Sequence, residues 1–190
     1  MEQIKQWDRE FFLWLNNAHA AWLDQPMYWM TKILFWLPLY ILLIFLLFKK
    51  LGKQSWWALL CVTIAIVLSD QLMTSFMKPF FARLRPSHEP SLKGLVHLVN
   101  NYRGGLYGFA SGHAATTFAV ATIVWLLLRH HYRWMSLVFL WAALMTYTRI
   151  YLGVHYPGDI LVGAIAGIIC GWLGFRIYQY ILKKKIPSVA

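Results

Sequence analysis

Acidic side chains are scarce in this 190-residue chain. Aspartate and glutamate number 7 against 18 lysines and arginines, and charged residues make up only 13% of the sequence. A soluble domain carries about 25% charged residues, so the composition excludes an ordinary soluble protein. The net charge of +11 is divided among short segments between apolar runs. Because there is no long basic tract, we do not expect a nucleic-acid partner.

Cysteine is also rare. The two cysteines, Cys61 and Cys170, both lie inside apolar runs. Their number and spacing exclude a disulfide framework and a CxxC metal site. We expect them to be small buried or lipid-facing side chains.

Apolar residues are abundant instead, at 59% of the chain. Several runs reach the ~20 residues that a helix needs to cross a bilayer. We expect five spans, at about residues 26–48, 56–77, 111–128, 134–151 and 157–182. The sequence therefore predicts an all-α integral membrane protein, a bundle of five to six transmembrane helices that forms a single domain over residues 1–190.

Residues 1–22 are predicted to form an amphipathic helix in the membrane interface, because apolar residues recur there at helical spacing between charges. These residues are Ile4, Trp7, Phe11, Trp14 and Leu15. In the last span, Gly163, Gly167 and Gly171 recur every four residues. Such a face suits close helix packing within one chain or between chains, so the oligomeric state is left open.

Basic residues in the loops predict the orientation. They are Lys49, Lys50 and Lys53 after the first span, Arg129 and Arg133 after the third, and Lys183–Lys185 after the last. With five spans these segments share one side, and the positive-inside rule makes that side the cytoplasm. The polar segment 78–112 and the 148–157 turn would then face the extracytoplasmic side of the cell membrane.

Three polar clusters meet at that outer level. They are Lys78 with Arg83 and Arg85, then Ser111-Gly112-His113, then Arg149 with His155 and Asp159. Three fixed cations, Lys78, Arg85 and Arg149, favour a compact anion such as phosphate. Ser111 and Gly112 at a helix start add a hydroxyl and backbone N–H donors. Anchoring to lipid headgroups is the alternative interpretation of the basic residues.

The two histidines suggest a division of roles. Asp159 follows His155 by four residues, a spacing that lets its carboxylate fix the tautomer of the ring. His155 is the candidate nucleophile on phosphorus, and His113 is the candidate acid for the leaving oxygen. Alternatively, His113, His155 and Asp159 could bind a metal. Three neighbouring cations would oppose a divalent ion, so we expect neither a metal nor another cofactor.

These clusters resemble the signature of the type 2 phosphatidic acid phosphatase family, which shares its site with vanadium haloperoxidases. The family pattern is K-x6-R-P, then P-S-G-H, then S-R-x5-H-x3-D. Ala110 and Thr148 replace the proline and serine of that pattern, and neither change removes a group needed for chemistry. The resemblance covers about residues 56–182. It implies a metal-independent phosphatase with a phosphohistidine intermediate on His155 and acid catalysis by His113.

The short chain and outward site resemble the bacterial undecaprenyl-diphosphate phosphatases of this family. We therefore expect hydrolysis of undecaprenyl diphosphate to undecaprenyl phosphate during lipid-carrier recycling for cell-wall synthesis. The alternatives are phosphatidylglycerophosphate or lipid A phosphatase activity and lipid phosphotransfer. A binder or translocator of lipid phosphate without turnover is a further alternative, which the paired histidines disfavour. The expected partners are a membrane lipid phosphate and the bilayer.

Several polar residues have no assigned role. Asp70 lies inside the second span, where an acid is a candidate functional residue. It either braces Lys78 or is a carboxyl hydrogen-bonded between helices. Arg83, His88 and His97 fall outside the family signature.

Overall fold

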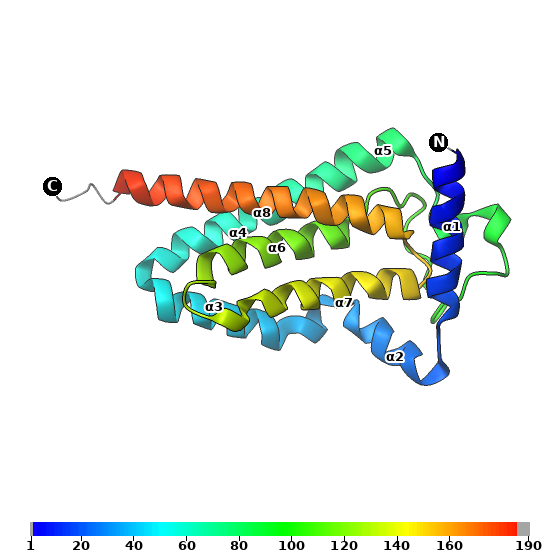
Figure 1. Ribbon diagram of the computed structural model, residues 1–190, viewed down its shortest axis with the longest axis horizontal. Helices are drawn as coiled ribbons and strands as arrows, with labels where there is room; N and C mark the ends of the chain where they lie inside the picture. Colours follow the sequence, from blue (N-terminus) through cyan, green and yellow to red (C-terminus); the bar gives the residue numbers. More distant parts are fainter. Residues whose placement is uncertain (1, 186–190) are drawn as a thin grey trace.

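A computed structural model describes residues 2–185. Every regular element in this range is helical, which confirms the all-α prediction. The long helices lie side by side as a bundle, and α1 crosses one end of it (Figure 1).

The helix α1 (Glu2–Asn17) packs on the bundle through Phe12 and Asn16, which are both fully buried. The Asn16 amide donates to the carbonyls of Ile150 and Tyr151 at 3.0 and 2.9 Å. It thereby satisfies carbonyl groups that the end of a helix leaves free. The predicted apolar positions Ile4, Trp7, Phe11 and Trp14 remain exposed, as an interfacial helix requires.

The first predicted span is not one helix, so that prediction was wrong. Helix α2 (Ala21–Met30) ends before an extended Lys32, a short 3-10 turn η1 covers Ile33–Trp36, and α3 runs over Leu37–Leu51. The indole of Trp36 donates to the freed Met30 carbonyl at 2.7 Å. Pro38 lies at the start of α3, where its missing N–H costs nothing.

The second span begins as predicted and extends further. After the turn η2 (Gly52–Gln54), α4 (Ser55–Gln71) passes into a wider π-helical segment η3 (Leu72–Met77) and then into α5 (Lys78–Phe81). The irregular loop is therefore residues 82–111, since Lys78 is still helical. A π-helical segment inside an α-helix frequently marks a functional site.

The remaining long helices are α6 (Gly112–Leu128), α7 (Leu137–Tyr151) and α8 (Pro157–Lys185), with the turn η6 (Arg133–Ser136) before α7. The glycine face of α8 packs against the backbone of α6. A Cβ atom on Gly163, Gly167 or Gly171 would collide with the carbonyl oxygens of Ser111, Ala115 and Ala119. This face is used within the chain, and the close approach brings the start of α6 beside the start of α8.

The long loop folds back on itself over this end of the bundle. Leu84 and Tyr107 form an isolated antiparallel bridge, and the Arg85 N–H donates to the Leu106 carbonyl at 3.1 Å. Two short turns, η4 (Pro86–His88) and η5 (Pro90–Leu92), follow the first half of the bridge. The pairing places Arg83 and Arg85 on a strand-like segment held across the helix ends.

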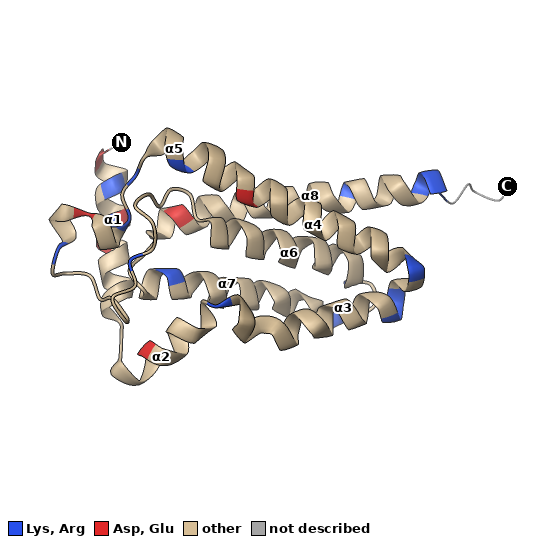
Figure 2. Ribbon diagram, turned by 180° about the vertical axis from the view of Figure 1, so that it is seen from behind, with Lys and Arg blue, Asp and Glu red and all other residues tan. Residues whose placement is uncertain are grey.

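The two ends of the bundle carry most of the charged residues, and large apolar side chains are exposed between them. The loop end carries both basic and acidic positions, whereas the coloured positions are all basic at the end where α3 meets α4 and where α8 stops (Figure 2). There Lys50 lies 5.5 Å from the ring centre of Tyr132, and Lys185 lies 4.0 Å from that of Trp57. Large apolar side chains stay exposed between the two ends, including Ile41, Phe45, Leu161, Ile165 and Ile169. This pattern suits helices that face lipid.

Among residues 2–185, two helical stretches are long and apolar enough to cross a bilayer, Ile33–Phe81 and Pro157–Lys185. The first reverses direction at Gly52–Gln54, so α3 and α4 are its two arms. The count of five to six spans stays a prediction.

Candidate active site

A cavity of about 710 Å³ opens at the loop end of the bundle, between α4, α6 and α7. Six of the predicted site residues line it, namely Lys78, Arg85, Gly112, His113, Arg149 and His155. They come from three separate segments of the chain, residues 78–85, 112–113 and 149–155. The fold thus brings the three sequence clusters to one place, as their order and topology predicted.

The end of α7 holds Arg149 and His155 together. Gly153 adopts a left-handed conformation with φ +71° and ends the helix, a conformation that glycine adopts without steric cost. The backbone N–H groups of Val154 and His155 then both donate to the Arg149 carbonyl, at 3.0 and 3.2 Å. This turn carries both side chains into the cavity wall.

His155 is buried and oriented by Asp159. The Asp159 carboxylate accepts the Tyr156 N–H at 3.0 Å and lies 3.3 Å from Nδ1 of His155. With the proton on Nδ1, the other ring nitrogen, Nε2, keeps its lone pair. Burial lowers the pKa of His155 well below its ordinary value, and the guanidinium groups of Arg85 and Arg149 lower it further. The ring is therefore neutral near pH 7, as a nucleophile must be.

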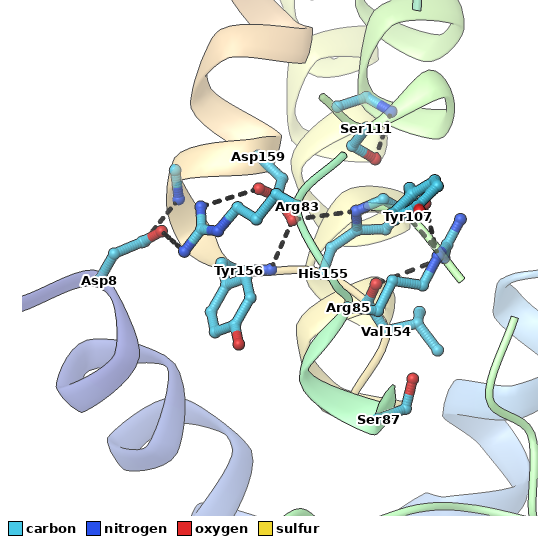
Figure 3. A network of polar contacts seen from close by, with 12 residues as sticks. Asp8, Arg83, Arg85, Ser87, Tyr107, Ser111, Val154, His155, Tyr156 and Asp159 are labelled. Carbon is cyan, nitrogen blue, oxygen red and sulfur yellow. Dashed lines mark hydrogen bonds and ion pairs between the residues drawn. The ribbon is translucent and has the colours of Figure 1, made fainter. Parts of the chain in front are cut away.

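Arg83 has a different place from the other cations. It does not line the cavity; it lies behind Asp159, with Nη1 3.0 Å from Asp159 Oδ1 and Nη2 2.7 Å from Asp8 Oδ2 (Figure 3). Its guanidinium also stacks 3.9 Å from the ring centre of Tyr156. The arrangement makes Arg83 a support for Asp159 rather than a phosphate ligand.

Asp8 joins this network, a connection that sequence reasoning missed. It projects from α1, and its second oxygen accepts the Gly158 N–H at 2.7 Å in the first turn of α8. A carboxylate is stabilised there by the partial positive charge of the helix start. In the sequence Asp8 is one of three acids in α1, with Glu2 and Glu10, and the local pattern does not indicate a partner 75 residues away.

Arg85 lies beside the nucleophile. Its Nε donates to the Tyr107 carbonyl at 3.1 Å, and its Nη1 lies 3.3 Å from both the Val154 carbonyl and His155 Nε2. Gly104, with φ +65°, allows the loop to pass close, because a Cβ there would lie 2.8 Å from Nη1. The loop backbone thus fixes a guanidinium next to the atom expected to attack phosphorus.

Arg149 is buried, and two side chains missed by sequence reasoning hold it. Its Nη1 donates to the Thr31 hydroxyl at the α2–η1 break, and its Nη2 donates to the Tyr102 hydroxyl at 3.1 Å. Its Nε has no partner among the described residues although it is buried. A buried donor without an acceptor is costly, and a bound anion would satisfy it.

The start of α6 supplies the other wall. Lys78 Nζ lies 3.9 Å from the position of a Cβ on Gly112, so the ammonium group and the exposed backbone of Gly112 are adjacent. Ser111 is buried outside the cavity lining: its hydroxyl accepts the Ala114 N–H at 3.4 Å, and its own N–H donates to the Asp159 carbonyl at 3.0 Å. Its role as a phosphate ligand stays a prediction.

The remaining loop histidines lie elsewhere. His97 pairs with Asp24 at 2.9 Å and stacks on His19, and His88 borders a second, smaller cavity. Within residues 2–185, no group of three or more His, Cys, Asp or Glu side chains is placed to hold a metal ion. The expectation of a metal-free site stays a prediction.

Fold and site together define a helical enzyme that places an oriented, neutral histidine among cations able to bind a phosphate group. Comparison with known proteins gives the family. Residues 55–183 match the PAP2 superfamily, so the chain belongs to the type 2 phosphatidic acid phosphatases and is a lipid phosphatase.

Curated relatives include the lipid A 4'-phosphatase of Bacteroides thetaiotaomicron, 39% identical over 99% of this chain and 84% of that protein. The undecaprenyl-diphosphatase of Sulfolobus acidocaldarius is 30% identical over 99% of this chain and 86% of that protein. Among solved structures, LpxE of Aquifex aeolicus is 32% identical with a TM-score of 0.62, over 88% of this chain and 93% of that one.

Proposed function

We propose that this lipid phosphatase removes a phosphate monoester from a phosphorylated glycolipid of the lipid A type. The observation that carries the proposal is a cavity with cations at its loop end and an apolar wall deeper in the bundle. That wall includes Ile66, Val67, Val120, Trp141 and Met145. A lipid could place its phosphate among the cations while its chains stay against the helices. The lipid A 4'-phosphatase relatives, at 39% and 38% identity, favour this substrate over undecaprenyl diphosphate.

In the proposed first step the phosphate binds to Lys78, Arg85 and the unpaired Nε of Arg149. Nε2 of His155 attacks phosphorus while Asp159 holds the opposite ring nitrogen. The bond from phosphorus to the lipid oxygen breaks, and His113 gives that oxygen a proton. The cations stabilise the charge on the phosphoryl oxygens, which is the main catalytic contribution in such transfers.

In the second step a water molecule attacks the phosphohistidine. His113, now deprotonated, takes a proton from this water, the bond from Nε2 to phosphorus breaks, and inorganic phosphate leaves. His155 and His113 return to their starting forms, so the cycle closes without a metal. An acceptor other than water would make the same site a phosphotransferase.

The charge distribution supports an extracytoplasmic site in a multi-pass protein. Among the described residues, the end away from the cavity carries basic positions without acids, whereas the cavity end carries both signs (Figure 2), and the positive-inside rule assigns the acid-free basic end to the cytoplasm. A reporter fused at Lys53 should be cytoplasmic and one in the 90–95 segment should not. The reverse result would place the active site on the cytoplasmic face.

Phosphate release from purified protein in detergent tests the function. Lipid A, phosphatidylglycerophosphate and undecaprenyl diphosphate are compared at matched concentrations, with and without chelator. We expect the highest kcat/KM on lipid A, no loss in chelator and no release by His155→Ala. Faster turnover of undecaprenyl diphosphate would overturn the substrate assignment, and loss in chelator would overturn the metal-free mechanism.

A further inference from the structure

The cavity is layered, and its middle layer has no role in the chemistry above. On α4 and α5 the lining residues run from Lys78 to Asp70 and Gln71, and then to Val67 and Ile66. The first residue is cationic, the next two are polar and the last two are apolar. The middle layer lies between the phosphate-binding end and the lipid-binding wall.

The same order appears on α6. Gly112 and His113 lie at the phosphate end, Thr116 and Thr117 follow one turn deeper, and Val120 comes last. A substrate whose part next to the phosphate is purely apolar would fit this layer poorly. The polar side chains of the layer would lose water on binding and would find no hydrogen-bond partner on the substrate.

Asp70 is the unusual member of this layer. Within residues 2–185 its carboxylate makes no hydrogen bond or ion pair with another side chain, whereas its backbone carbonyl accepts from the Thr74 hydroxyl at 2.8 Å. Asp70 Oδ1 lies 3.6 Å from the position of a Cβ on Gly112, and Lys78 Nζ lies 3.9 Å from the same point. A carboxylate thus stands beside the phosphate position, where it would repel a second anionic group.

The layer is rich in acceptors. The hydroxyls of Thr116 and Thr117 donate to the backbone carbonyls of Gly112 and His113, at 3.0 and 2.6 Å. Their oxygens can therefore act only as acceptors toward a ligand. Gln71 uses its carbonyl oxygen to accept from Ser75 at 2.9 Å and keeps its NH₂ group. A ligand that fits must therefore bring hydrogen-bond donors to Asp70.

We propose that Asp70, with Thr116 and Thr117, forms a subsite that accepts a hydroxyl or ammonium group next to the scissile phosphate. This inference rests on the proposed function and narrows its substrate class to phosphates borne on a hydroxylated or aminated headgroup, such as a sugar. A polyprenyl diphosphate offers no donor at this depth, and its second phosphate would meet the carboxylate. Asp70 thus selects between the two substrate classes that the relatives represent.

The test compares Asp70→Ala and Asp70→Asn with the wild type on three probes. They are a phosphorylated glycolipid, its deoxy analogue lacking the hydroxyl beside the phosphate, and a polyprenyl diphosphate. For Asp70→Ala we expect kcat/KM on the glycolipid to fall at least about tenfold, through KM, because a hydrogen bond to a charged group is lost. Activity on the deoxy analogue and on the polyprenyl diphosphate should be unchanged or higher.

Asp70→Asn should fall between wild type and Asp70→Ala, since it keeps one acceptor oxygen without the charge. Thr63→Val is the matched control, an exposed position on the same helix, and should leave all three activities unchanged. Equal losses on all probes would overturn the subsite and leave Asp70 as a support for Lys78. An unchanged glycolipid KM would overturn it as well. A wild type inactive on every probe would instead overturn the proposed function.

Discussion

Asp8 and Arg83 form an ion pair of 2.7 Å directly behind the carboxylate that orients His155. Asp8 lies on the helix that crosses the end of the bundle, and Arg83 lies in the loop above the active site. The pair therefore ties α1 to the active site through a chain of four polar side chains, from Asp8 through Arg83 and Asp159 to His155 (Figure 3). Both members are mostly buried, with side-chain exposures of 13% and 23%.

Asp8→Asn should lower kcat about tenfold and leave KM nearly unchanged, because Arg83 loses its counter-charge and no longer fixes Asp159. Supports of this kind around an active-site group typically contribute about 10- to 100-fold. Asp8→Ala should lose more, since the Gly158 N–H then loses its acceptor. Steady-state kinetics on the preferred lipid measure both effects.

Glu10→Gln is the matched control for Asp8, because it removes an acid from the same helix at an exposed position whose carboxylate accepts a hydrogen bond from the neighbouring Gln6. In a double variant with Arg83→Gln, the losses should not multiply, since both changes break one pathway. Multiplying losses, or a change confined to KM, would contradict a positioning role for Asp8.

His113 can be tested as the general acid by changing the leaving group. His113→Asn should reduce kcat/KM on a lipid phosphate about 10²- to 10⁴-fold. On p-nitrophenyl phosphate the loss should be much smaller, because nitrophenolate leaves without a proton. His155→Ala should lose activity on both substrates alike. Equal losses for the two His113→Asn reactions would show that His113 does not protonate the leaving oxygen.

The acid side of the pH profile should reflect the environment of His155. Burial and the neighbouring guanidinium groups lower its pKa, so protonation should inactivate the nucleophile only well below pH 6.5. Arg85→Gln removes one of these positive charges, which should move the acid limb of kcat/KM toward higher pH. Since the substrate titrates identically in both assays, the difference between the two profiles isolates the enzyme. A shift toward lower pH, or no shift, would contradict this account.

Sequence reasoning located the parts of the site whose spacing is local. Arg149, His155 and Asp159 fall within one helix end, one turn and one helix start, so their proximity follows from eleven residues of sequence. It could not find Thr31 or Tyr102, which contact Arg149 from 118 and 47 residues away. Partners at such separations are set by how whole helices pack, and neither residue type carries a signal of its own.

The same limit explains the first span. The apolar pattern over residues 26–48 predicted one helix, but Thr31 accepts a hydrogen bond from Arg149, and Lys32 lies 5.5 Å from the ring centre of Tyr102. These tertiary contacts interrupt the helix where the local pattern alone would continue it. The apolar sequence pattern thus predicted a helical bundle correctly. It failed at residues 31–32, where contacts with active-site side chains break the helix.

The packing of α8 on α6 gives a last prediction, about stability. A side chain at Gly167 would collide with the Ala115 backbone, so Gly167→Ala must push the two helices apart. Overpacking of this kind costs about 1–3 kcal/mol, and we expect a lower melting temperature in detergent. Activity should fall as well, because the hydrogen bond from Ser111 to the Asp159 carbonyl couples the two helix starts. The control is Ile165→Ala on the exposed side of α8. A Gly167→Ala protein as stable and active as wild type would show that the two helices do not need this close contact.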